Sequence, residues 1–355
     1  MRLEVVILDS RAVSFIEESF LKPLLEIEGV TDISFNGKAI FYLHNELGRL
    51  KSDILVSNED VKAFLRHLAN LCEQQFSYMN PFLDISIGKY RLNAVFHTVG
   101  RNENNKVYTF SLRIASSELK IYEGCDFLDE NLNVLFKTLL NNNVSIVIGG
   151  ITGSGKTEFQ KYLIHSLKEN TRLIVIDNIL ELDGIKEFDH LDLTIWQSDE
   201  KLHSTSIQNL VKNALRNNPD FIVVAESRGA EMIEVLNSSM TGHPIITTIH
   251  SYDAESLPNR MSRMVMMNDK KMDYKDVYYD VCHHFPIAIY LERDMKDGKV
   301  HRYIKKVLEI SNDGNHNTLY EKINNQPIYG KFKYDLTNRL INVDPLFKAV
   351  FLDRG

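Results

Sequence analysis

Short apolar runs alternate with amphipathic stretches through the middle of the chain. The apolar runs predict strands at 144–148, 172–176, 221–225 and 244–249, and helical spacing predicts helices at 131–140, 157–167, 207–217 and 229–240. Apolar strands that alternate with helices are typical of a mainly parallel sheet covered on both faces. Nearer the C-terminus, 285–293 and 301–310 predict two strands around a turn at Asp297 and Gly298. We therefore expect the sheet to gain antiparallel strands there.

The first part of the chain has a different pattern. The sequence from Ser57 to Asp60 is a capping box, and apolar residues follow it at helical spacing as far as Cys72. Residues 90–98 and 107–114 predict strands, with the polar run 102–105 as the turn between them. We expect a smaller α+β domain at 1–118 and an α/β domain at 119–355, with the boundary in the short polar segment 116–124.

Composition narrows the class of protein without defining it. The chain has 355 residues, enough for two domains, and its formal net charge of −7 disfavours a dedicated nucleic-acid-binding protein. Three scattered cysteines, Cys72, Cys125 and Cys282, favour neither a disulfide framework nor a structural zinc site, and indicate a reducing, cytosolic setting. The N-terminus does not resemble a signal peptide, and the longest apolar runs are too short to span a bilayer. Any membrane role is therefore expected to be peripheral.

The strongest chemical signal is a glycine-rich loop between a predicted strand and a predicted helix. It matches G-x-x-x-x-G-K-[ST] at every position: Gly150, Ile151, Thr152, Gly153, Ser154, Gly155, Lys156 and Thr157. Glycines let the backbone N–H groups wrap around phosphate oxygens, and the helix that follows directs its positive end at them. Lys156 brings a mobile charge to the terminal phosphates, and the Thr157 hydroxyl is placed to ligate Mg²⁺. The loop predicts a binding site for ATP and Mg²⁺.

Three segments after the loop resemble motifs of the hexameric traffic ATPases of type II and type IV secretion, conjugation and pilus assembly. The segment 172–182 is similar to the family's acidic box, 214–228 to its second nucleotide strand, and 241–250 to its histidine box. The resemblance implies a RecA-like P-loop NTPase domain with a mainly parallel sheet, preceded by a smaller N-terminal α+β domain. It also implies ATP hydrolysis that powers export or pilus assembly.

The resemblance gives candidate roles to acidic residues and histidines after the loop. Glu226, after an apolar strand, is expected to hold Mg²⁺ through water, and Asp177, at a comparable strand end, to orient or deprotonate the attacking water. Glu181 is the reserve candidate for that base. His243 and His250 are candidates for sensing the γ-phosphate or coupling hydrolysis to subunit motion. Each of these histidines could equally be structural.

Three arginines are further candidates, each with a structural alternative. Arg228 is expected to pair with a nearby acid. Arg91 and Arg113 resemble the arginines with which the family's N-terminal domain reaches the nucleotide, in some members across a subunit boundary. A solvated or salt-bridged surface is an equally good interpretation of both. If a neighbour supplies them, isolated monomers are expected to hydrolyse ATP poorly.

The acidic box departs from the family, whose usual Glu-Asp pair is here Asp177-Asn178. Aspartate reaches about one methylene less far than glutamate, which keeps open a nucleotide-binding regulator with little turnover. A helicase or packaging motor of the same core class is a further alternative, although the chain lacks a basic and aromatic stripe.

Features outside the site residues indicate a subfamily and a setting. The chain lacks the four-cysteine insert common in general secretion members. Its C-terminal sequence looks more like the type IV secretion and conjugation branch or its tight-adherence pilus relatives. The resemblance implies a homo-hexamer in the cytoplasm, attached peripherally to secretion or pilus proteins at the inner membrane.

Overall fold

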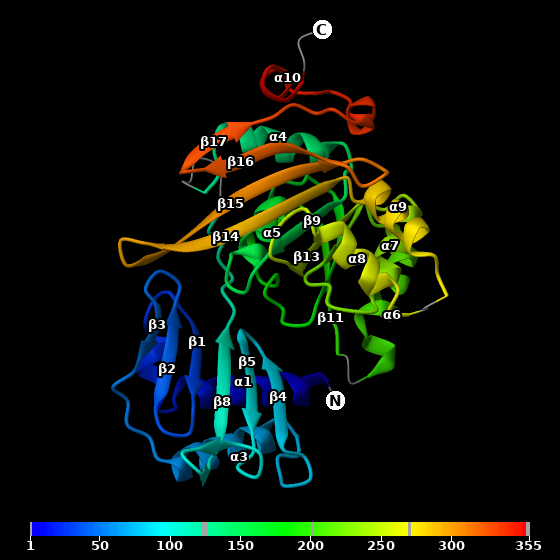
Figure 1. Cartoon of the computed structure of the whole chain (residues 1–355). Coiled ribbons are helices and arrows are strands. Elements are labelled where there is room, and N and C mark those ends of the chain that lie inside the picture. The colour runs from blue at the N-terminus through cyan, green and yellow to red at the C-terminus, as the bar shows by residue number, and fades with distance from the viewer. Residues whose placement is uncertain (1, 122–126, 200–201, 269–270, 353–355) are drawn as a thin grey trace. The chain divides into compact units, whose positions relative to one another are not determined.

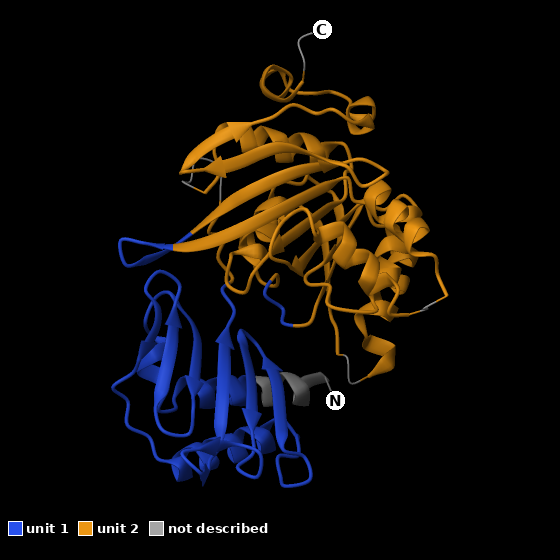
Figure 2. Cartoon of the chain, viewed as in Figure 1, with its two compact units in different colours: residues 1–116, 179–181, 295–301 blue, residues 117–178, 182–294, 302–355 orange. Residues whose placement is uncertain are grey.

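The structure is a computed structural model that describes residues 2–121, 127–199, 202–268 and 271–352. It divides into two compact units (Figures 1 and 2). Unit 1 comprises Met1–Ser116, Ile179–Glu181 and Met295–His301; unit 2 comprises Ser117–Asn178, Leu182–Asp294 and Arg302–Gly355. The first break falls after Ser116, two residues before the predicted boundary. The 122–124 part of the predicted boundary segment, and Cys125, lie outside the described residues.

Unit 1 is built on one antiparallel sheet with the order β3-β2-β1-β8-β5-β4. Its elements are α1 (Arg2–Glu17), α2 (Lys22–Leu25), β1 (Val30–Phe35), β2 (Ile40–His44), β3 (Gly48–Lys51), α3 (Asn58–Leu71), β4 (Phe82–Ile87), β5 (Tyr90–Val95), β6 (Arg101–Asn102), β7 (Asn105–Lys106) and β8 (Thr109–Ile114). The predicted capping box is confirmed: Ser57 accepts from the Asp60 backbone N–H, and the Asp60 carboxylate accepts from that of Ser57. Helices α1 and α3 pack on one face of this sheet (Figure 1).

Unit 2 contains a larger sheet with the order β11-β10-β12-β13-β9-β14-β15-β16-β17. Its helices are α4 (Glu130–Asn141), α5 (Lys156–His165), α6 (Ile207–Ala214), α7 (Met232–Met240), α8 (Leu257–Val265), α9 (Tyr274–His284) and α10 (Pro345–Phe351). Its strands are β9 (Ile146–Gly150), β10 (Arg172–Asp177), β11 (Asp192–Gln197), β12 (Phe221–Val224), β13 (Ile245–His250), β14 (Ile287–Lys296), β15 (Lys299–Ile310), β16 (His316–Ile323) and β17 (Gln326–Tyr329). Short 3-10 turns lie at Lys186–Phe188, His203–Thr205, Leu215–Asn217 and Asp335–Arg339.

Alternation of side chains along the central strands explains the apolar runs in the sequence. In β9, Ile146 and Ile148 belong to one buried cluster, with α4, α5 and α10, whereas Val147 belongs to the other, with α6 to α9. Both faces are therefore covered, as the sequence predicts. The methionines of α8 divide: Met261 and Met264 are buried in the second cluster, and Met267, just beyond the helix, is exposed.

The sheet changes direction on one side of β14. Strands β11, β10, β12, β13, β9 and β14 pair parallel, and β15, β16 and β17 pair antiparallel. This extension confirms the predicted C-terminal strands. A buried carboxylate links this antiparallel extension to the segment that follows β17. Glu309, at zero exposure, accepts from Asn317 Nδ2 (3.1 Å) and from the backbone N–H groups of Lys333 (2.8 Å) and Tyr334 (3.0 Å).

The length and hydropathy of the helices decide whether any of them could span a membrane. None of the helices within the described residues is long and apolar enough to cross a membrane.

Candidate functional site

Four neighbouring parallel strands, β10, β12, β13 and β9, end at the same edge of the unit 2 sheet. In the register of these strands, His250 is level with Gly150, and Val224 is level with Thr247. Glu226 lies two residues beyond Val224 and so comes level with the end of β13. Because adjacent strands lie about 4.8 Å apart, the register places His250 between the glycine loop and Glu226.

The glycine loop leaves β9 at this edge and leads directly into α5. Gly153 (φ +75°) and Gly155 (φ +94°) adopt left-handed backbone conformations that side chains with a Cβ disfavour. At Gly150 the constraint is space, because a Cβ there would lie 2.4 Å from the Ser154 Oγ. These three glycines are therefore required by local geometry, independently of any ligand. The open N–H groups that follow from this path form a cradle for an anion.

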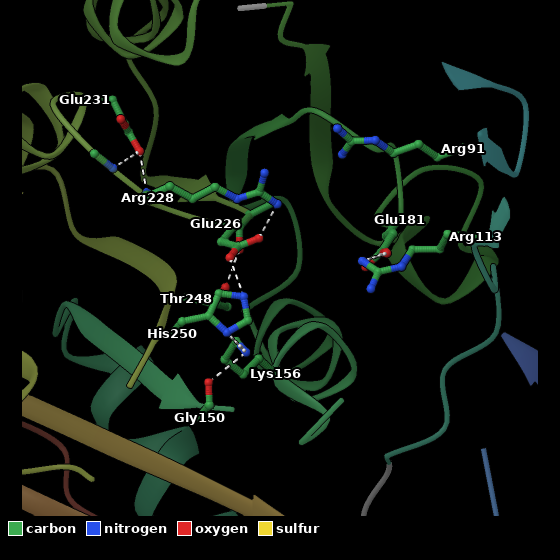
Figure 3. A network of polar contacts seen from close by, with 12 residues as sticks. Arg91, Arg113, Gly150, Lys156, Glu181, Glu226, Arg228, Glu231, Thr248 and His250 are labelled. Carbon is green, nitrogen blue, oxygen red and sulfur yellow. Dashed lines mark hydrogen bonds and ion pairs between the residues drawn. The ribbon is translucent and has the colours of Figure 1, made fainter. Parts of the chain in front are cut away.

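Lys156 points back towards the end of the sheet. Its Nζ donates to the Gly150 carbonyl (2.9 Å) and the Ile151 carbonyl (3.1 Å), and it lies 3.3 Å from His250 Nδ1 (Figure 3). The residue is buried, with 8% of its surface exposed. A buried ammonium held by two carbonyls is already desolvated and directed at the loop. A phosphate bound there replaces neutral acceptors with charged ones, which form stronger hydrogen bonds.

Glu226, His250 and Arg228 form a chain of polar contacts beside Lys156 (Figure 3). His250 Nε2 lies 2.9 Å from Glu226 Oε1, and Arg228 Nη2 donates to Glu226 Oε2 at 2.6 Å. An ammonium group can only donate hydrogen bonds. The His250 Nδ1 that faces Lys156 is therefore the unprotonated nitrogen of the ring. The neutral imidazole then carries its proton on Nε2, towards the Glu226 carboxylate. Thr248 Oγ1 donates to the Ala225 carbonyl (2.7 Å) and fixes the chain before Glu226.

The electrostatics of this cluster keep Glu226 charged and His250 neutral. Burial acts to raise the pKa of Glu226, but the hydrogen bond and charge of Arg228, with His250 and Lys156, outweigh it and hold the pKa below its ordinary value. Burial and the charge of Lys156 lower the pKa of His250, and the nearby carboxylate does not restore it. The arrangement therefore presents an ionised acid and an uncharged base next to the phosphate loop.

Asp177 ends β10 at the same edge of the sheet and is buried, with 2% of its surface exposed. The Ala225 backbone N–H donates to the Ile176 carbonyl (3.0 Å), which continues the pairing of the two strands as far as this point. Glu181 lies elsewhere: it belongs to unit 1, where its Oε1 is 3.7 Å from Arg113 Nη1. Asp177 thus shares the edge with Glu226, and Glu181 contacts an arginine of unit 1.

Arg91 and Arg113 stand directly opposite each other on β5 and β8. Like charges at opposed positions of a ladder repel, and acids offset this repulsion. Arg91 Nη2 lies 3.6 Å from Asp84, and Arg113 Nε lies 3.4 Å from Asp32. Both arginines belong to unit 1 and the phosphate loop belongs to unit 2, so their supply to a nucleotide stays a prediction.

His243 does not join the cluster around the phosphate loop. It precedes β13, which begins at Ile245, whereas His250 ends that strand. Seven residues of mostly extended chain separate the two histidines, which is roughly 20 Å at about 3.3 Å per residue. The reason is the parallel sheet, which gathers strand ends of one kind at one edge. The strand therefore separates His243 from this loop, and its sensing and coupling roles both stay predictions.

Sequence reasoning missed two arginines beside the phosphate loop. Arg302, on β15, donates from Nε to the Gly153 carbonyl (2.8 Å). Arg293, on β14, lies against the same glycine, because a Cβ built on Gly153 would be 2.8 Å from its Nη1. A signal was available in the sequence: both residues are equally distant from the predicted turn at Asp297 and Gly298, so a regular hairpin brings them together.

The donor set fits Mg²⁺ in the way nucleotide-binding sites hold it. No group of three or more His, Cys, Asp or Glu side chains that could hold a metal ion occurs among the described residues. Mg²⁺ on a nucleotide needs one or two protein oxygens, since phosphates and waters complete its shell. The Thr157 hydroxyl, in the first turn of α5, and the ionised Glu226 carboxylate are the oxygens that suit it. Bound there, the ion would neutralise charge on the phosphates.

Comparisons with known proteins identify the family of the chain. The sequence model of the family described as type II/IV secretion system protein matches residues 102–277, about half of the chain. An uncharacterized Bacillus anthracis protein is 28% identical over 318 residues, which cover 86% of this chain and 69% of the relative. The type IV secretion system protein VirB11 of Bartonella quintana is 32% identical over 135 residues, which cover 37% of this chain and 38% of VirB11.

A solved structure shows the same fold. The Legionella pneumophila ATPase DotB superposes with a TM-score of 0.58 at 20% identity, over 79% of this chain and 77% of DotB. The glycine loop, the parallel sheet and the family match together define the class of the protein as a secretion-system protein. The chain belongs to the type II/IV secretion traffic ATPases, in the type IV branch.

Proposed function

We propose that the protein is a Mg²⁺-dependent ATP hydrolase with a RecA-like P-loop domain and an N-terminal domain, acting as a ring-shaped, hexameric motor for protein or DNA–protein export or pilus assembly. The observation that carries this proposal is the chain of contacts from Lys156 through His250 to Glu226, at the strand edge that also holds the phosphate loop. Hydrolysis needs charge on the γ-phosphate, a metal and an oriented water. Lys156 supplies the first, and Thr157 and Glu226 suit the second.

The same geometry supports a division of roles among the acids. Glu226 is ionised and partly exposed, with 17% of its side chain accessible, so it can receive a metal-bound water. Asp177 is buried at the neighbouring strand end and is the candidate for orienting the attacking water. His250 contacts both Lys156 and Glu226, so it is the candidate for reporting the state of the γ-phosphate. The match to VirB11 supports the assignment to secretion.

Hydrolysis is tested with the purified protein, ATP and Mg²⁺. We expect turnover in the wild type, no turnover in Lys156→Ala, and a loss of at least about 100-fold in Glu226→Gln, because that substitution removes a charge needed around the transition state. Glu234→Gln is a matched control: it removes another ion-paired carboxylate with 14% side-chain exposure, in the first turn of α7, and is expected to keep wild-type activity. Wild-type turnover equal to that of Lys156→Ala refutes the enzyme and favours a nucleotide-binding regulator.

Ring assembly and a shared site are tested by mixing inactive subunits. Mass photometry of the purified protein with ATP is expected to show hexamers. In the cell, we propose that secretion or pilus proteins hold the hexamer at the cytoplasmic face of the inner membrane. If Arg91 and Arg113 serve a neighbour's nucleotide, Arg113→Ala and Lys156→Ala subunits are each inactive alone and regain part of the activity when mixed. No recovery in mixed hexamers argues against arginine supply across the boundary. Stimulation by DNA with a steep salt dependence would favour a nucleic-acid motor instead.

A further inference from the structure

Helix α5 carries an amide on the side that packs against the sheet, where apolar residues are usual. Gln160 has no exposed surface, and its neighbours Phe159 and Leu163 belong to the first buried cluster. Its Nε2 donates to the Val224 carbonyl at 3.3 Å, which exceeds the usual range of about 2.7–3.2 Å. Its Oε1 is buried and accepts no hydrogen bond from the described residues. The amide is therefore only half satisfied.

A purely structural role does not account for an amide at this position. Burying an acceptor without a donor costs the free energy of removing it from water, and one long hydrogen bond does not offset that cost. A methionine would fill a similar volume without burying any polar atom. Buried polar atoms that lack a partner in the protein chain indicate a water or an ion, or a role in catalysis. The Oε1 of Gln160 thus indicates a ligand that brings a donor to this point.

The position of Gln160 relates it to both oxygens that suit Mg²⁺. It follows Thr157 by three residues on α5, and residues three apart lie on the same side of a helix. Val224, whose carbonyl it contacts, is the last residue of β12 and precedes Glu226 by two residues. The amide therefore joins the helix that carries one of these oxygens to the strand that leads to the other.

We propose that Gln160 is a positioning residue for the Mg²⁺ of the bound nucleotide. Its Nε2 holds the end of β12 against α5, and its Oε1 accepts a hydrogen bond from a water of the metal shell. The inference rests on the proposed nucleotide site and adds the support behind Thr157 and Glu226. Mg²⁺ keeps several waters when phosphates bind it, and such waters donate to nearby protein oxygens. An amide oxygen suits that role, and an apolar side chain does not.

Binding of Mn²⁺, as a substitute for Mg²⁺, to the protein with ADP tests the proposal without relying on turnover. Electron paramagnetic resonance of free Mn²⁺, with the protein in excess over ADP, gives the Kd for the metal. Gln160→Met removes both polar groups at similar size and is expected to raise this Kd about 10-fold, because loss of a group behind the metal ligands weakens metal binding by about 10- to 100-fold. Isothermal titration is expected to show weaker ADP binding in this variant with Mg²⁺ and unchanged ADP binding in EDTA.

Two further variants identify the acting atom. Gln160→Glu keeps an oxygen at the same reach and is expected to bind Mn²⁺ at least as tightly as the wild type. Asn133→Ala is the control, because it removes another buried amide beside α5: Asn133 is 3% exposed, and its Oδ1 accepts from the Tyr162 hydroxyl at 2.6 Å. This control lies on α4, away from the metal, and is expected to bind Mn²⁺ like the wild type.

The outcomes separate this inference from the proposed function. If the wild type binds ADP and Mn²⁺, and Gln160→Met binds both within about twofold of the wild type, the inference is wrong and the ATPase proposal stands. A loss of ADP binding that is equal with Mg²⁺ and in EDTA also overturns it, since α5 itself is then disturbed. Equal Mn²⁺ losses in Gln160→Met and Gln160→Glu overturn it as well. If the wild type binds neither ADP nor Mn²⁺, the proposed function and the inference both fail. Should Gln160→Met unfold, Gln160→Leu gives the same comparisons.

Discussion

Replacing Gly153 by alanine separates backbone strain in the phosphate loop from contact with the β14–β15 hairpin. At φ +75° an alanine occupies the left-handed region at a cost of about 1–2 kcal/mol. Gly184, at φ +68° with nothing within 4 Å of a built Cβ, carries the same backbone cost without a neighbour. We therefore expect Gly153→Ala and Gly184→Ala to lower the melting temperature similarly, by roughly 2–4 °C, because the guanidinium near Gly153 is a flexible end that can move.

Nucleotide affinity is expected to differ between the two variants. Gly153 belongs to the phosphate loop, and a Cβ there also meets Arg293, so Gly153→Ala is expected to shift the loop and raise the Kd for ADP about tenfold, whereas Gly184→Ala is expected to leave it unchanged. A double-mutant cycle with Arg293→Ala identifies the cause. If the effect passes through the arginine, most of the loss caused by Gly153→Ala disappears in the Arg293→Ala background. Equal losses in both backgrounds would refute the reasoning and assign the effect to the loop backbone alone.

Three further predictions concern stability and charge. Glu309→Ala leaves three buried donors without their acceptor, so we expect it to lower the free energy of unfolding of unit 2 by about 3–5 kcal/mol, measured in urea. Glu321→Ala, at the surface, is the control. A change below about 0.5 kcal/mol in Glu309→Ala would show that these hydrogen bonds contribute little. The depressed pKa of His250 means that the unfolded chain takes up its proton first, so stability present above pH 6.5 is expected to fall as the pH drops below it. His250→Gln should flatten this part of the profile, and an unchanged profile would contradict the assignment. Arg113→Ala is expected to lower the free energy of unfolding by less than about 1 kcal/mol, because the ion pairs of Arg113 are partly exposed. If thermal scans of this variant match those of the wild type, any loss of its activity is not caused by unfolding.

The elements that bury apolar faces could be predicted from the sequence. Strands β9, β10, β12 and β13 appear as apolar runs because helices cover both faces, and the capping box at Ser57 predicts the start of α3. The edge strand β11 was missed, since its side chains are only partly buried and its pattern is weak. Strands β16 and β17 were missed for a related reason: buried positions of β16 are interrupted by exposed and half-buried ones, and β17 is mostly exposed, so neither strand forms a continuous apolar run.

For the site, local motifs could be predicted and juxtapositions could not. The loop from Gly150 to Thr157 carries its own signature, and Glu226 follows a recognisable strand. That His250 meets Lys156 and Glu226, whereas His243 lies at the other end of β13, depends on the strand order, which no local pattern contains. Arg293 and Arg302 were missed because they lie some 140 residues beyond the loop, and tertiary pairing alone brings them back to Gly153.

The central claim is that the edge formed by the phosphate loop, His250 and Glu226 hydrolyses ATP. Its most direct test is steady-state phosphate release from purified wild type, Lys156→Ala and Glu226→Gln with saturating ATP and Mg²⁺, beside ADP titrations of the same three proteins. We predict turnover in the wild type, at least about a 100-fold loss in both variants, and ADP binding retained by Glu226→Gln. Phosphate release by the wild type that Lys156→Ala does not reduce would contradict the account.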